Sequence, residues 1–149
     1  MDNPKAEVRK SKTCLGVFAK SKIKKGEIVA SIDGKILGWN AQWNNYQRSH
    51  AIQFARKKWR LSNGLATKLN HSCAPNCGIK NLFDIVAMRD IRKDEELFWD
   101  YEMTEASENK WSMWCKCSTK SCRKFISNYN NLPPSTRKKY RGYISKWLI

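Results

Sequence analysis

Short hydrophobic segments recur along the chain, and glycine, proline or charged residues separate them. Residues 50–61 illustrate the pattern, because Ile52 and Phe54 alternate with polar neighbours as they would on a half-buried strand. Strands are predicted at residues 14–19, 24–32, 50–61, 83–88 and 96–101. Residues 134–147 have at most a weak helical pattern. Many short strands and little helix predict a mainly β fold.

The length of 149 residues fits one domain. No internal repeat or long flexible linker divides the chain, so one unit with a C-terminal extension is the simplest expectation. A hydrophobic content of 41% is enough for a packed core. No apolar run approaches the roughly 18–20 residues of a membrane helix, and the charged start has no signal-peptide core. We therefore expect an intracellular protein without membrane contact.

The net charge of +16 favours polyanionic partners such as nucleic acid. Both ends are basic: residues 109–149 contain ten lysines or arginines and no acid, and residues 5–25 are also basic. By contrast, residues 94–108 contain seven of the thirteen acids and no basic residue. This acidic island is interpreted either as an ordinary solvated surface or as an attraction site for a basic peptide.

The sequence lacks the motifs that are typical of several classes of enzyme. No two glycines are spaced as G-x-G, which excludes the dinucleotide fingerprint, and the phosphate-binding loop motif is also absent. The chain has two histidines and no G-x-S-x-G sequence, so a hydrolase triad is a poor fit.

Three cysteines lie within eight residues as Cys115-x-Cys117-x4-Cys122, a spacing typical of metal ligation. A tetrahedral zinc site needs a fourth ligand, for which Cys73 and Cys77 are both candidates. The even total of six cysteines also permits disulfides, but a chain without a signal peptide argues against them.

Three separated motifs resemble those of the SET-domain protein-lysine methyltransferases. Residues 70–76 read N-H-S-C-A-P-N, residues 96–101 read E-L-F-W-D-Y, and residues 114–123 resemble the family's post-SET zinc module. Their order and spacing also fit, and residues 16–27 resemble the first SET strands. The likeness runs from about residue 10 to the C-terminus. The compact length is most similar to the small stand-alone SET proteins.

The resemblance implies small curved sheets of the β-clip type, with the segment that carries N-H-S-C threaded as a pseudoknot. It divides the chain into an N-terminal tail (1–9), a SET domain (10–108) and a post-SET zinc module with a basic segment (109–149).

The resemblance also implies roles for individual residues. Tyr101 would be the catalytic tyrosine. S-adenosyl-L-methionine would be bound by Gly16, Phe18, Asn70, His71 and Trp114. The substrate channel would be lined by Trp99, Phe98, Tyr46 and Phe54. Zinc would be bound by Cys73, Cys115, Cys117 and Cys122. Trp111 is expected in the core, whereas Trp114 could contact either the cofactor or the core.

The sequence departs from the family pattern at two glycine positions, where it has Cys14 and Ser118. Trp99 occupies the position that influences how many methyl groups are added, and the number is left open. The implied activity is methyl transfer to a lysine of a basic protein, such as a histone or histone-like protein, associated with chromatin or a nucleoid. Whether that chromatin is the cell's own or, after secretion, a host's is also left open. The alternative is a catalytically silent SET-like module that binds nucleic acid through its basic C-terminal segment; contact of the enzyme itself with nucleic acid through its basic ends is also expected.

Overall fold

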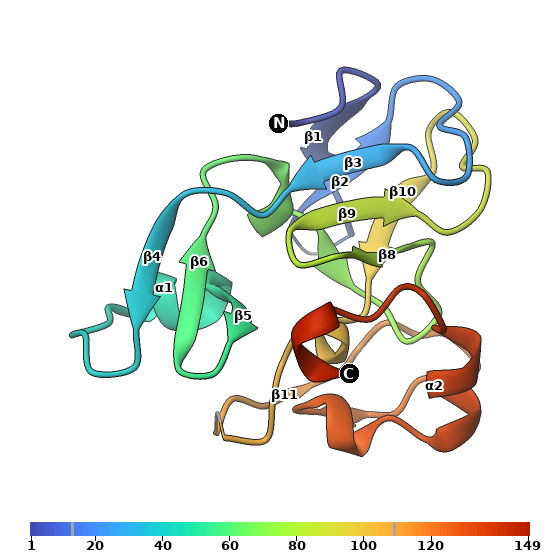
Figure 1. Ribbon diagram of the computed structural model, residues 1–149. Coiled ribbons are helices and arrows are strands. Elements are labelled where there is room, and N and C mark those ends of the chain that lie inside the picture. The colour runs from blue at the N-terminus through green and yellow to red at the C-terminus, as the bar shows by residue number, and fades with distance from the viewer. Residues whose placement is uncertain (13, 109) are drawn as a thin grey trace.

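Short strands form several small sheets in this protein (Figure 1). The computed structural model describes residues 1–12, 14–108 and 110–149. Within those ranges the first sheet contains, in spatial order, β1 (Ala6–Lys10), β2 (Leu15–Ala19), β10 (Glu96–Trp99) and β7 (Asn70–His71). The others are β3 (Ile28–Ser31) with β9 (Asp84–Ala87) and β8 (Cys77–Lys80), β4 (Lys35–Gly38) with β6 (Lys58–Leu61) and β5 (Ile52–Ala55), and β11 (Met113–Trp114) with β12 (Phe125–Ile126). The mainly β prediction is confirmed.

Helices are few and short. The two α-helices are α1 (Asn45–His50) and α2 (Pro134–Lys139), and the 3-10 helices are η1 (Leu65–Thr67), η2 (Tyr101–Met103), η3 (Tyr129–Asn131) and η4 (Lys146–Leu148). Helix α1 begins with a capping box between Asn44 and Gln47. No helix in the described ranges is long and apolar enough to cross a membrane.

Strand β10 holds the first sheet together, because it pairs with a strand on each side. It is antiparallel to β2, with Leu97 opposite Val17, and parallel to β7, with Trp99 opposite His71. Strands that are distant in the sequence are thereby placed side by side. This pairing brings the predicted SET segments that begin at Gly16, Asn70 and Glu96 into one region.

The N-terminal residues are more ordered than predicted. Residues 1–9 are expected to be a tail, but β1 begins at Ala6 and pairs antiparallel with β2, with Val8 opposite Val17. The backbone N–H of Asn3 also donates to the carbonyl of Val29. Strand β1 supplies hydrogen-bond partners to an edge that β2 would otherwise expose.

The core contains the fully buried Ile23, Ile85 and Leu97, and the C-terminal segment contributes Leu132 and Ile144 to the same cluster. Residues 129–149 therefore fold onto the main body, and Figure 1 shows the dark red chain after α2 passing below β8. The predicted boundary residue 109 lies outside the described residues. In the same view β4, β6, β5 and α1 form an arm at one side of the molecule.

Asn76 connects the chain after β7 to β10. Its side-chain amide donates to the carbonyl of Glu96 at 2.8 Å and accepts from the N–H of Phe98 at 2.8 Å. Asn76 is 4% exposed, so both backbone groups depend on it away from solvent. The Asn76 side chain thus makes the two hydrogen bonds to the β10 backbone that a neighbouring strand would make.

We predict that Asn76→Ala lowers the free energy of unfolding by about 2–4 kcal/mol, because two buried backbone groups lose their partner. Urea unfolding followed by circular dichroism measures this. The exposed Asn63 offers a matched control, and Asn63→Ala should change the same quantity by less than about 0.5 kcal/mol. Equal effects of the two substitutions would contradict the assigned role.

Candidate active site and metal centre

Successive side chains of β10 leave the strand on opposite faces. Leu97 and Trp99 are 0% and 2% exposed, whereas Glu96 and Phe98 on the other face are only half-buried. Each face borders its own pocket. Trp99 lines one pocket, and Glu96 and Phe98 line the other.

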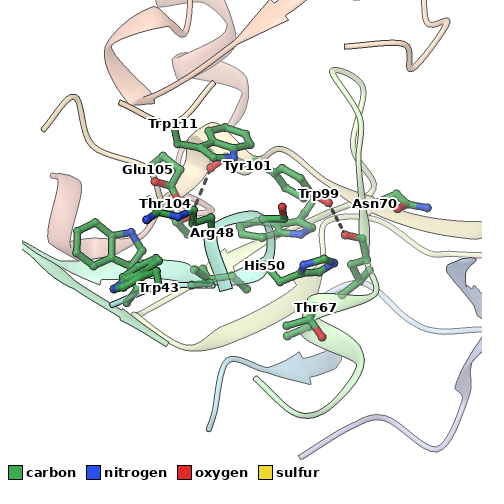
Figure 2. Close-up of a pocket in the computed structure, with 16 residues that line it drawn as sticks. Trp43, Arg48, His50, Thr67, Asn70, Trp99, Tyr101, Thr104, Glu105 and Trp111 are labelled. Carbon is green, nitrogen blue, oxygen red and sulfur yellow. Dashed lines mark hydrogen bonds between the residues drawn. The ribbon is translucent and has the colours of Figure 1, made fainter. Parts of the chain in front are cut away.

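The first pocket, which we call the aromatic pocket, has a volume of about 170 Å³ and is shown in Figure 2. Five aromatic side chains line it: Trp43, Trp59, Trp99, Tyr101 and Trp111. Ring centroids lie 5.1 Å apart for Trp43 and Trp59, 5.2 Å for Trp99 and Tyr101, and 6.0 Å for Tyr101 and Trp111. Packed aromatic rings of this kind suit an alkyl chain that ends in an amine.

Tyr101 begins η2 at the base of the aromatic pocket. Its hydroxyl donates to the carbonyl oxygen of Leu69 at 2.9 Å, directly before β7. Burial raises the pKa of Tyr101 well above its usual value, so the hydroxyl stays protonated and acts as a donor. The arrangement places one oriented hydroxyl beside a backbone carbonyl.

His71 supports Tyr101 from β7. Its Nδ1 accepts the backbone N–H of Tyr101 at 3.3 Å and lies 3.6 Å from Oδ1 of Asp100. Burial lowers the pKa of His71 to about 4, although the Asp100 carboxylate opposes this shift. The imidazole is therefore neutral at pH 7, as acceptance of that N–H requires.

The second pocket, which we call the polar pocket, lies on the Glu96 face of β10. It is lined by Ser72, Ala74, Asn76, Arg89, Glu95, Glu96, Phe98, Cys117 and Thr119. Next to this face, the amide nitrogen of Asn70 donates to Glu96 Oε1 and to the carbonyl of Leu15, both at 3.0 Å. A Cβ at Gly16 would meet the end of the Glu96 side chain, so the carboxylate would have to shift if this glycine were replaced.

Three residues predicted to line the channel are not among the described residues that line the aromatic pocket. Phe98 borders the polar pocket, because strand alternation points it away from Trp99. Tyr46 is 47% exposed and stacks on His50 with ring centroids 4.2 Å apart. Phe54 packs against Phe83 with centroids 5.3 Å apart.

The structure also places the other aromatic candidates. Trp114 is 72% exposed and lies edge-on to Phe125 at 5.2 Å. Phe18 pairs with Glu96 across the sheet, beneath the guanidinium of Arg9. Trp111, expected only in the core, packs against the cysteine-rich cluster and also lines the aromatic pocket.

Several pocket residues were not predicted from the sequence. Trp43, Trp59, Thr104 and Glu105 reach the aromatic pocket from the arm and from the chain after η2. The high number of tryptophans, seven in the chain, was the one available signal, and it does not indicate position.

The acidic island does not form one acidic surface. Asp100 and Glu102 are buried and pair with Arg123, while Glu95 pairs with Arg89 at 2.8 Å. Asp94 and Glu108 also pair with arginines. Of the seven acids, only Glu105 is among the described residues that line the aromatic pocket. The interpretation of the island as a whole as an attraction site for a basic peptide is therefore wrong.

Four cysteines converge beside Tyr101 and Trp111, which line the aromatic pocket. The sulfur atoms of Cys73, Cys115, Cys117 and Cys122 all lie within 4.8 Å of one another. Cys73 and Cys115 sulfurs are 3.7 Å apart, close to the edge of about 3.8 Å that four 2.3 Å Zn–S bonds would give in a tetrahedron. Cys77 is instead buried in β8 in the main core, so geometry selects Cys73 as the fourth candidate ligand.

The four sulfurs differ in their surroundings: burial raises the pKa of Cys73 to about 11 and also raises that of Cys115. The backbone N–H of Arg123 donates to Cys73 at 3.4 Å, a contact typical of metal-bound sulfur. Burial alone would raise the pKa of Cys117, but hydrogen bonds, including one with the Thr119 hydroxyl, lower it to about 6. All six cysteines, each within the described ranges, are free thiols. The donor set and spacing fit zinc.

Comparisons with known proteins agree with this geometry. The family model of the SET domain matches residues 15–102. A histone-lysine N-methyltransferase, H3 lysine-4 specific, from Schizosaccharomyces pombe is 31% identical over 135 residues, which cover 76% of this chain and 14% of that enzyme. The Emericella nidulans protein of the same name is 35% identical over 71 residues, covering 43% of this chain and 6% of that protein. This chain thus matches only a small part of these relatives.

Two solved structures are also similar. A Plasmodium falciparum candidate histone methyltransferase superposes with a TM-score of 0.54 and 25% identity, covering 65% of this chain and 96% of that chain. Polycomb Repressive Complex 2 of Chaetomium thermophilum, solved as a humanized mutant, superposes with a TM-score of 0.58 and 22% identity over 66% of this chain and 15% of that chain. The second likeness concerns the fold alone.

We expect the purified protein to contain one zinc ion per chain, measured by elemental mass spectrometry. Cys122→Ser should lose most of this zinc and lower the melting temperature, because metal binding stabilises the segment that carries three of the ligands. Cys14→Ser is the control, since Cys14 is exposed and outside the cluster, and it should retain zinc. The assignment would be contradicted if wild-type protein contained no zinc and if Cys122→Ser had the same melting temperature as wild type.

Proposed function

The chain belongs to the SET-domain family, and from this premise we propose that it is a protein-lysine N-methyltransferase that uses S-adenosyl-L-methionine. One observation carries the proposal. The aromatic pocket and the polar pocket lie on opposite faces of β10; Tyr101 and Asn70 line the aromatic pocket, and Asn70 also donates to Glu96, which lines the polar pocket. Two substrates could thus approach one point from opposite sides.

The polar side supplies groups that fit the cofactor. Asn70 and Glu96 offer an amide and a carboxylate for its amino-acid end, and Gly16 leaves room for close approach of a ligand to the backbone. Phe98 in the polar pocket offers an aromatic surface for the adenine. When bound there, S-adenosyl-L-methionine supplies an electrophilic methyl group on a positively charged sulfur.

The aromatic side suits the lysine. A free lysine amine has a pKa of about 10.4 and is protonated at neutral pH. Burial between Trp99 and Trp111 would disfavour the ammonium form, so the proton can leave to water without a dedicated base. The neutral nitrogen then attacks the methyl carbon as the carbon–sulfur bond breaks, giving methyl-lysine and S-adenosylhomocysteine.

Tyr101 would orient that nitrogen. Its hydroxyl is held by Leu69 and kept protonated by burial, so it can exchange this contact for one with the amine. The neighbouring carbonyl oxygen can make weak C–H···O contacts with the methyl group. Neither group needs to change its ionisation state during the transfer.

We propose that the substrate is a basic, chromatin-associated protein, because the relatives are named for action on histone H3. This implies that the protein acts within a cell, on chromatin. Glu105 at the aromatic pocket provides one acidic group on the substrate side.

Tyr101→Phe should lower methyl transfer by about 100-fold or more, because the amine loses its orienting hydroxyl. The assay follows labelled methyl from S-adenosyl-L-methionine to core histones and to total cell proteins, with the modified lysine located by mass spectrometry. Tyr129→Phe is the matched control and should transfer normally, since Tyr129 packs under Arg137 in the C-terminal segment. Zinc-loaded wild-type protein that labels no protein in either mixture would contradict the enzymatic proposal.

A second proposal concerns nucleic acid. Lys138, Lys139, Arg141 and Lys146 are exposed on the C-terminal segment, and residues 110–149 contain no acid that could pair with them. Such a surface neutralises phosphates by releasing counterions. We propose that it binds DNA next to the protein substrate.

Replacing Lys138 and Lys139 by alanine should reduce the slope of log K against log salt concentration by about 1.8 in fluorescence anisotropy with a DNA duplex. Lys35→Ala/Lys58→Ala removes the same charge from the arm and serves as the control. Equal slopes for both double variants would refute a role for this surface. DNA binding without cofactor affinity or methyl transfer would favour the silent binding module over the enzyme.

A further inference from the structure

The C-terminal segment, residues 129–149, makes a series of hydrogen bonds to the chain around Tyr101. The N–H of Tyr129 donates to the carbonyl of Glu105 at 2.8 Å, and that of Ser145 donates to Met103 at 3.0 Å. The indole N–H of Trp147 donates to the carbonyl of Thr104 at 3.0 Å. Three consecutive carbonyls after Tyr101 are therefore held by a segment beyond the part of the chain that the SET family model matches.

Tyr140 adds a bond on the other side of η2. Its hydroxyl donates to Asp100 Oδ2 at 2.9 Å, and the two residues are 4% and 0% exposed. Asp100 directly precedes Tyr101 and caps η2 by accepting the N–H of Glu102 at 3.1 Å. Arg123 pairs with the same carboxylate at 2.8 Å. Asp100 is thus held in place by Tyr140 and Arg123, both from the C-terminal third of the chain.

The segment is itself anchored to the main body. The N–H of Ile79 donates to the carbonyl of Tyr143 and the N–H of Lys146 donates to that of Asn81, both at 2.9 Å. Leu132 and Ile144 are buried in the main core. Because the segment is bonded both to the main body and to the chain around η2, it holds η2 in a fixed place relative to β8 and the core.

We propose that Tyr140 is a positioning residue for Tyr101, acting through Asp100, and that residues 129–149 form a brace that fixes the turn which carries Tyr101. The inference rests on the proposed methyltransferase function. Its physical basis is that alignment of the amine with the methyl group depends on where the Tyr101 hydroxyl lies, and small displacements of such groups lower the rate strongly. Tyr140 does not line the aromatic pocket, so it acts on orientation rather than on substrate contact.

The first test compares Tyr140→Phe with Tyr143→Phe. The control removes a hydroxyl from the same segment, at a ring that packs over Lys80 instead of reaching Asp100. We expect Tyr140→Phe to lower kcat about tenfold, with KM for peptide and cofactor within about twofold of wild type and zinc content unchanged. Tyr143→Phe should match wild type. A purely structural role would instead lower zinc content and raise both KM values.

The second test does not depend on activity. Hydrogen exchange followed by mass spectrometry should show faster exchange in Tyr140→Phe for peptides covering residues 100–105, with the core strands unchanged. If Tyr140→Phe does not fold, Trp147→Phe replaces it, because that change removes the indole N–H that donates to Thr104 and keeps an aromatic ring at this position.

The outcomes distinguish failure of the brace from failure of the proposed methyltransferase function. Unchanged kcat together with unchanged exchange at residues 100–105 would overturn the brace. If wild-type protein transfers no methyl group, the proposed function fails, and the exchange experiment alone then decides whether the brace holds the turn.

Discussion

The pairing of β10 with β2 on one edge and β7 on the other is the constraint on which the site depends. Each pairing joins segments that are more than 20 residues apart in the sequence, and the parallel contact with β7 places His71 opposite Trp99. Side-chain alternation along β10 then assigns Trp99 to one pocket and Phe98 to the other. A shift of one residue in register would exchange the two faces and abolish the site.

A buried polar network connects this sheet to the cysteine cluster. Arg123 follows the candidate ligand Cys122 and pairs with Asp100 and Glu102, which precede and follow Tyr101. Removing one partner from such a buried group of charges costs about 3–5 kcal/mol, because the remaining charges lose their compensation. The cysteine cluster and the turn carrying Tyr101 are therefore parts of one structural unit. This explains why a short, poorly regular C-terminal segment can contribute to a precise site.

The sequence predicted the fold class and the local motifs well, since these depend on neighbouring residues. Residues 70–76 and 96–101 carry their side-chain pattern in the sequence itself, and the cysteine spacing indicated a metal. Contributions from distant segments were not predictable in the same way. Trp43 and Trp59 reach the aromatic pocket only because the arm folds back towards η2. Phe98 lines the polar pocket and Trp99 the aromatic pocket, a separation that strand alternation in the sequence could have indicated.

The distribution of charge along the sequence was the least reliable guide to the site, because a count of acidic residues does not show which of them form ion pairs in the fold. Asp100 and Glu102 are buried beneath the site and bind Arg123, so they cannot attract a peptide from solution. The strand β1 was missed for a related reason: its alternating Glu7 and Arg9 resemble a solvated tail, but they lie on a sheet edge where Arg9 also pairs with Asp94.

The most direct test of the two-sided site is a crystal structure of the protein with S-adenosylhomocysteine and a lysine peptide. The account predicts the cofactor product on the Gly16, Asn70 and Phe98 side, with its sulfur directed towards the Tyr101 hydroxyl, and the lysine side chain in the aromatic pocket. A cofactor product bound among Trp43, Trp59 and Trp99, or both ligands on the same face of β10, would contradict it.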